Sequence, residues 1–136
     1  MGYCMDCTDS EFFIPEASKE KALMAIKALA GKETIRDSSG PHFSWVNTTE
    51  FRNAKTLKEA MQAWRWSVEE DEKGDVVGIY FNGEKLGDDV ILFEAIGPFV
   101  RKGSFIQLRG EDNSMWRWKF TGKTMHEVTA TISWSE

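Results

Sequence analysis

The chain is poor in the residues that define several common kinds of protein. Its 136 residues include two cysteines, two histidines and three prolines. No stretch reaches the roughly 18 consecutive apolar residues that a membrane-spanning helix needs, so a soluble protein without a membrane segment is expected. The N-terminal sequence lacks a basic segment followed by an apolar one, so no secretory signal is expected and the cytoplasm is the expected compartment.

Motifs that carry well-known chemistries are also missing. The sequence has no nucleophile elbow, no phosphate-binding glycine loop and no H-E-x-x-H helix. The segment GEKLGDD resembles the start of a phosphate loop, but its two aspartates would repel phosphate and no Lys-Ser or Lys-Thr follows. We therefore predict no catalytic residue and no cofactor, and a binding protein is favoured over an enzyme.

Acidic residues outnumber basic ones and are unevenly placed. The chain has 22 acidic and 17 basic residues, a net charge of −5, so direct nucleic-acid binding is not expected. From Glu69 to Glu94 there are nine acidic residues and two lysines. Such a band attracts a partner with a basic surface, or it is simply a solvated face with acidic turns. The candidate partner-binding residues are Glu69, Glu70, Asp71, Glu72, Asp88, Asp89 and the aromatic Trp45.

Hydrophobic spacing predicts an α+β fold in a single domain spanning residues 1–136. We expect an antiparallel sheet with a C-terminal meander, packed on one face by about three helices. Thr56 and Glu59 have the spacing of a capping box, and the Asp88-Asp89 pair favours the start of another helix. The expected elements are strands within 3–14, bulged near 8–10, a helix within 15–31, a strand over 42–47, a helix over 56–64, a hairpin over 66–81, a helix from 88 to about 98, and strands in 104–109, 114–120 and 127–134.

The tripeptide Trp-Arg-Trp occurs twice, at 64–66 and 116–118, and raises the question of a ligand-stacking platform. Alternation assigns both indoles of the second copy to the apolar face of the meander, so core is the favoured interpretation. The predicted apolar face comprises Ile106, Leu108, Trp116, Trp118, Phe120, Val128, Ala130, Ile132 and Trp134. The opposite face would carry Gln107, Arg109, Arg117 and Lys119, an alternative site for a small ligand or nucleotide, or else a solvated face with pairs such as Arg117 with Glu127.

Two further sets of residues suggest weaker alternatives. Cys4 and Cys7, with His42 and His126, have the composition of a zinc site, but free cytosolic thiols are favoured and no metal is predicted. The pairs Asp88 with Asp89 and Glu69 with Glu70 suggest a hydrolase with a general acid and base. Such pairs also arise by chance in an acidic chain.

The segments SEFFIPEASKEKALMAIKALAG, HFSWV, TLKEAMQAWRW and GEKLGDDVILFEAIGPFVRKGSFIQLRGEDNSMWRWKF resemble small uncharacterised proteins carried by bacteriophages and mobile elements. That resemblance implies a setting and transfers no site. Small acidic phage-borne domains are often modulators that bind a host factor, including inhibitors of host defence, which agrees with the missing catalytic motifs. We expect a non-enzymatic binding module of this kind, acting through its acidic surface in the host cytosol.

Overall fold

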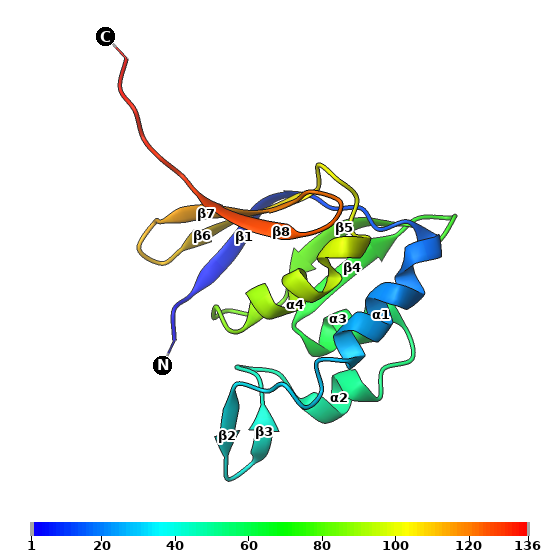
Figure 1. Ribbon diagram of the computed structural model, residues 1–136. Helices are drawn as coiled ribbons and strands as arrows, with labels where there is room; N and C mark the ends of the chain where they lie inside the picture. Colours follow the sequence, from blue (N-terminus) through cyan, green and yellow to red (C-terminus); the bar gives the residue numbers. More distant parts are fainter. Residues whose placement is uncertain (1, 136) are drawn as a thin grey trace.

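The computed structural model describes residues 2–135 (Figure 1). Its elements in chain order are β1 (Met5–Glu11), the 3-10 helix η1 (Glu16–Ser18), α1 (Lys19–Lys27), β2 (Ile35–Asp37), β3 (Gly40–His42), α2 (Thr48–Arg52), α3 (Leu57–Ala63), β4 (Trp66–Glu70), β5 (Val76–Phe81), α4 (Asp89–Ile96), the 3-10 helix η2 (Gly97–Phe99), β6 (Phe105–Gly110), β7 (Met115–Phe120) and β8 (Met125–Thr129). The fold is α+β. No helix in this part of the chain is long and apolar enough to cross a membrane.

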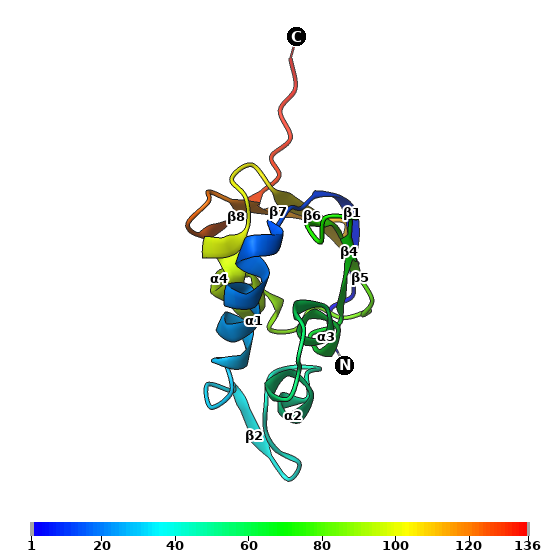
Figure 2. The same cartoon turned by 90° about the vertical axis from the view of Figure 1, so that its right-hand side faces the viewer.

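The largest sheet has four antiparallel strands in the order β1-β6-β7-β8. The pairs β4–β5 and β2–β3 form two further small sheets. Figures 1 and 2 show α1 and α4 on one side of the four-stranded sheet and no helix over its other face, which we call the open face. The predicted class, the C-terminal meander and the packing of helices against one face are therefore confirmed.

Aromatic side chains fill the space between the sheet and the helices. Phe93 of α4 lies 5.0 Å from Trp66 and 5.3 Å from Trp118, measured between ring centroids, and all three side chains are fully buried. A second cluster joins Phe43, Phe51 and Trp64, with centroids 4.8 to 6.1 Å apart. Burying large aromatic rings in this way contributes much of the stability of a small domain. Both Trp-Arg-Trp copies thus place indoles in the core, although Trp116 is only partly buried.

Local signals in the sequence explain several of these elements. The Thr56 hydroxyl accepts a hydrogen bond from the Glu59 backbone N–H at 3.1 Å, which confirms the predicted cap of α3. The β1–β6 register shifts between Cys7 and Asp9, which confirms the predicted bulge. The β4–β5 hairpin and the helix beginning at Asp89 are confirmed as well.

One prediction in the smaller elements was wrong, and one small helix was missed. The strand over 42–47 is replaced by β3 and a turn, in which Trp45 has a φ of 67°. The helix α2 follows directly and was not predicted, because five residues are too few to show a helical period. Its cap is the Asn47 side chain, which accepts from the Glu50 N–H.

The face assignment of β8 was also wrong. The turn from Thr121 to Thr124 pairs Phe120 with Met125, and this register places Val128 opposite Arg117. Val128 therefore lies on the open face and is 42% exposed. Glu127 is not a partner of Arg117 but accepts a hydrogen bond from Trp118 Nε1 at 2.9 Å. Ile132 and Trp134, also predicted to line the core, are 84% and 91% exposed.

Candidate functional site

Asp89, predicted to contact a partner, is fully buried and belongs to the core. Its carboxylate lies 3.0 Å from Arg65 Nη2, and it also accepts hydrogen bonds from Trp66 Nε1 and from the Gly87 N–H, both at 2.9 Å. Arg65 also donates to the Lys85 carbonyl at 2.7 Å and lies over the Phe81 ring. The first Trp-Arg-Trp copy therefore uses its arginine to neutralise a buried aspartate, which removes Asp89 from the acidic surface.

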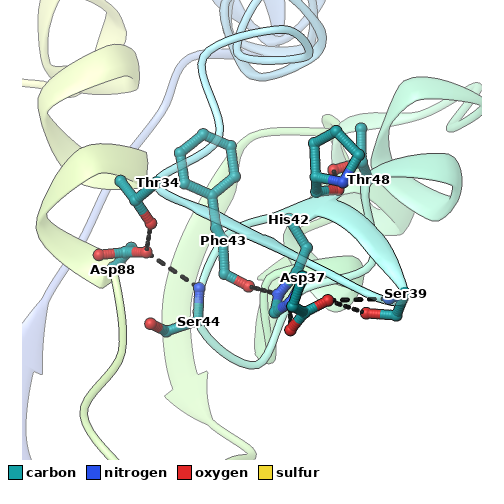
Figure 3. Close-up of polar contacts among 9 residues, drawn as sticks. Thr34, Asp37, Ser39, His42, Phe43, Ser44, Thr48 and Asp88 are labelled. Atoms are coloured by element: carbon teal, nitrogen blue, oxygen red, sulfur yellow. Dashed lines mark hydrogen bonds and ion pairs between the residues drawn. The ribbon is translucent and has the colours of Figure 1, made fainter.

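Asp88 is half-buried and is also used within the fold. Its Oδ2 atom accepts from Thr34 Oγ1 at 2.6 Å and from the Ser44 N–H at 2.9 Å (Figure 3), so it holds the β2–β3 region against the start of α4. Trp45 is 51% exposed and lies close to Gly87 in the same region. Figure 1 places this region and the β4–β5 turn at different ends of the molecule. The predicted acidic surface is therefore divided into two parts.

The acidic part at the β4–β5 turn includes residues with structural partners. Glu70 forms an ion pair with Lys19 at 2.7 Å, and Asp71 accepts hydrogen bonds from the N–H groups of Lys73 and Asp75, each at 3.0 Å. Glu69 and Glu72 are exposed. The buried Asp89 contacts Trp66 at the first end of β4, whereas this turn follows Glu70 at the other end. At about 3.3 Å per residue, the two ends of β4 are about 13 Å apart.

The structure places a second set of carboxylates beside β5, the strand that follows this turn, with Asp6 near Gly83 at the end of β5 away from the turn. Asp6, Asp9 and Glu11 are exposed side chains of β1, which runs beside β5. The prediction missed them because β1 and β5 are about 70 residues apart in the sequence. A local signal was present, since three acidic residues in one seven-residue strand are unusual for an element that lies against a core.

A groove separates the middle of β1 from the middle of β5. Backbone bridges join the two strands at Cys4 with Lys85 and at Ile14 with Val76. Between these bridges no backbone hydrogen bond joins residues 6–13 to residues 77–83. The resulting hollow of about 350 Å³ is lined by residues 6–10 of β1 and by Ile79, Tyr80, Phe81 and Gly83. We call it the β1–β5 groove.

The charge of the β1–β5 groove is of one sign. Asp6 and Asp9 are its charged lining residues, and no lysine or arginine lines it. Tyr80 is 54% exposed and donates a hydrogen bond to Glu69 at 3.2 Å, which raises the pKa of the tyrosine. The tyrosine thus connects the groove to the exposed carboxylate of β4. This arrangement combines an aromatic ring, unpaired strand edges and carboxylates on one surface.

The alternative anion site on the open face has its predicted residues but no convergent geometry. Arg117 Nε donates to Gln107 Oε1 at 2.8 Å, and Gln107 Nε2 donates to Thr8 Oγ1 at 3.1 Å. The Arg117 guanidinium also lies 4.8 Å from the centroid of the Phe105 ring. Arg109 and Lys119 are exposed at other positions of the register. The open face is therefore accessible but carries charges of both signs, because Asp6 lies opposite Arg109 on it, and its glutamine is already bonded at both ends.

A serine, a histidine and an aspartate meet in the β2–β3 hairpin, but not as a nucleophile and its base (Figure 3). Asp37 accepts from Ser39 Oγ and lies 2.9 Å from His42 Nε2, so the aspartate is between the other two. His42 Nδ1 faces the Phe43 carbonyl at 2.9 Å. The hydrogen bond to Asp37 raises the pKa of His42, and hydrogen bonds from His42 and from Ser39 together lower the pKa of Asp37 to about 2. The cluster favours a protonated histidine rather than a catalytic base.

The remaining candidate sites are not assembled. Cys4 Sγ accepts from Lys85 Nζ at 3.1 Å, and His126 lies near Thr124, so the proposed zinc ligands do not meet. Among residues 2–135 no group of three or more metal-ligating side chains is found. The two carboxylate pairs do not converge either, because each of the four residues has a partner of its own in the fold.

Comparisons with protein-family models, with curated proteins and with solved structures give no match to this chain.

Proposed function

We propose that the chain is a non-enzymatic binding module that engages a basic protein surface through the β1–β5 groove and the carboxylates around it. The observation that carries this proposal is the groove itself, where two strands separate and acidic residues of β1 meet Tyr80 of β5. Exposed tyrosines are common anchors at protein interfaces, and the phenol ring suits an arginine side chain. The binding surface therefore comprises Asp6, Asp9, Glu11, Glu69, Glu72 and Tyr80.

The proposal revises the acidic surface expected from the sequence. Asp88 and Asp89 hold the fold together, and Trp45 lies with them at the other end of the molecule. Glu69 and Glu72 remain in the surface and are joined by the β1 acids. In the setting that the resemblance implies, the module would inhibit a host or defence protein by covering a basic patch, in competition with nucleic acid.

Binding of a labelled oligoarginine peptide, followed by fluorescence anisotropy at low and high salt, tests the proposal. The variant Asp6→Asn/Glu11→Gln removes two exposed carboxylates that have no hydrogen bond or ion pair within residues 2–135. The matched control, Glu50→Gln/Glu94→Gln, makes the same change in net charge on α2 and α4. Losing two exposed charge pairs should weaken binding by about 2- to 30-fold.

The two variants separate a site from a general effect of charge. The groove variant should bind the peptide more weakly than the control and with a flatter salt dependence, while both keep the melting temperature of the parent. Equal binding by the two variants would exclude the β1–β5 groove as the interface. Binding after Arg109→Gln/Arg117→Gln should be retained or tighter, because Arg109 lies opposite Asp6 and the change removes positive charge beside the carboxylates.

A further inference from the structure

Strand β8 is an uncovered edge of the four-stranded sheet. It pairs with β7 on one side, and β1 at the other end of the sheet runs beside β5. Every residue from His126 to Ser135 is exposed. The sheet ladder ends where the Ala130 N–H donates to the Met115 carbonyl, and Figure 1 shows the following segment extending away from the body of the molecule.

The part of this edge that follows Glu127 lacks the features that usually protect an exposed strand. Residues 128–135 read VTATISWS, with no charged residue and no proline. β-branched and aromatic residues favour strands, whereas charges, prolines and bulges normally block pairing with another chain. Ile132 and Trp134 are the most exposed large apolar side chains of the described chain, at 84% and 91%. The edge is therefore suited to pairing.

The register of β8 determines where its apolar side chains lie. Val128 is opposite Arg117 on the open face, and His126 is opposite Lys119. Ala130 keeps this phase opposite Met115, and an extension of the strand beyond it would place Ile132 and Trp134 on the same side, so that the even-numbered side chains would form one stripe. At the start of the stripe a hollow of about 350 Å³, walled by Met115, Arg117 and Val128, is open on this face and is mainly apolar. The stripe and the hollow are neighbours.

We propose that two copies of the chain pair through their β8 edges, antiparallel and centred on Ala130, to form one continuous sheet. In this register Val128 of one copy faces Ile132 of the second copy, and the same pair recurs on the other side of the two-fold axis. The isoleucine then lies over the hollow beside Arg117. Trp134 of the second copy faces His126 next to Lys119, where an indole attracts the ammonium group.

A second copy is favoured because the stripe is complementary to itself. An antiparallel pair keeps even-numbered residues opposite even-numbered residues, so apolar side chains meet apolar side chains across the whole contact. A shift of one residue would place threonine and serine opposite this stripe. Each copy supplies both the protruding side chains and the hollow that receives them, which is the property of a two-fold interface.

Light scattering coupled to size exclusion, from micromolar to several hundred micromolar protein, tests the proposal. The parent chain should reach the mass of a dimer. Ile132→Lys should weaken dimerisation by about 100-fold or more, because the two-fold contact loses one aliphatic side chain from each copy. Because Ile132 lies outside the core, this variant should keep the circular dichroism and melting temperature of the parent. The control Met24→Lys changes a side chain that is 56% exposed on α1 and should dimerise like the parent.

Cross-linking tests the register separately. In a Cys4→Ser/Cys7→Ser background, Ala130→Cys places two thiols across the two-fold axis, with a Cα separation of about 4.5 to 5.5 Å that a disulfide spans. It should oxidise to a covalent dimer, whereas Lys123→Cys in the β7–β8 turn should not. A parent that stays monomeric at the highest concentration would overturn the proposal. Equal dimerisation of Ile132→Lys and Met24→Lys would overturn it as well.

Discussion

The ion pair between Arg65 and Asp89 gives the sharpest prediction about stability. Asp89 is completely buried, and the side chain of Arg65 is 16% exposed. Changing Asp89 to alanine leaves a guanidinium group in the interior without its counter-charge, and also leaves Trp66 Nε1 without an acceptor. Breaking a buried pair by removing one partner typically costs about 3 to 5 kcal/mol. A domain of this size has a total stability of about 5 to 15 kcal/mol, so the variant should be close to unfolding.

Urea unfolding at neutral pH, followed by tryptophan fluorescence, measures this cost. Asp89→Ala should lower the midpoint strongly at an unchanged slope. Arg65→Met, which keeps much of the apolar stem, should be costly alone because it leaves the carboxylate unpaired. The double variant Arg65→Met/Asp89→Ala should be more stable than the sum of the two losses allows, because neither charge is then left alone. A loss below about 1 kcal/mol for Asp89→Ala, or simple additivity in the double variant, would refute the buried pair as a major contribution.

Three other predictions follow from burial and from the pKa shifts. Trp118→Ala removes a fully buried indole and should cost about 3 to 5 kcal/mol in urea unfolding, whereas Trp134→Ser should leave the midpoint unchanged. Burial raises the pKa of Cys7, so alkylation followed by mass spectrometry at pH 8 should find this thiol less reactive than that of a short unstructured peptide. NMR titration should find the pKa of His42 above its usual 6.5, falling toward that value in Asp37→Asn; since the folded-state pKa is raised, the stabilisation from this contact is complete below about pH 6.5 and is lost as pH rises through the folded-state pKa.

Elements with strong local signals were predictable from the sequence, and those fixed by distant contacts were not. The cap of α3, the β4–β5 hairpin and the start of α4 each depend on residues within a few positions of one another. The face of β8 depends on the length of the turn that precedes it, and a turn that differs by one residue exchanges the two faces. The apolar alternation from Val128 to Trp134 therefore indicated the existence of β8, but neither its end at Thr129 nor which side of it is buried.

The candidate site shows the same division. Glu69 and Glu72 stood out because acidic residues cluster there in the sequence, and they remain on the surface. Asp89 belonged to the same cluster, but its burial depends on Arg65, which is 24 positions away. The groove is formed by strands that are distant in the sequence and joined at only two backbone bridges. Charge density along the chain therefore located part of the site, while the pairing of distant strands determined which carboxylates share a surface.

The two proposed interfaces lie at opposite edges of the same sheet, which has a consequence for binding. In the strand order β1-β6-β7-β8, the β1–β5 groove is beside the first strand and the dimer contact is on the last. A dimer formed through β8 therefore leaves both grooves open and joins them in one particle. When a partner with two basic patches has bound one groove, its second patch meets the second groove at a high effective concentration, so the two contacts together bind more tightly than either alone. Ile132→Lys should then leave the affinity for a short oligoarginine peptide unchanged and weaken binding to two such peptides joined by a long flexible linker. If the linked peptides bind this variant as tightly as they bind the parent, the two grooves do not act together.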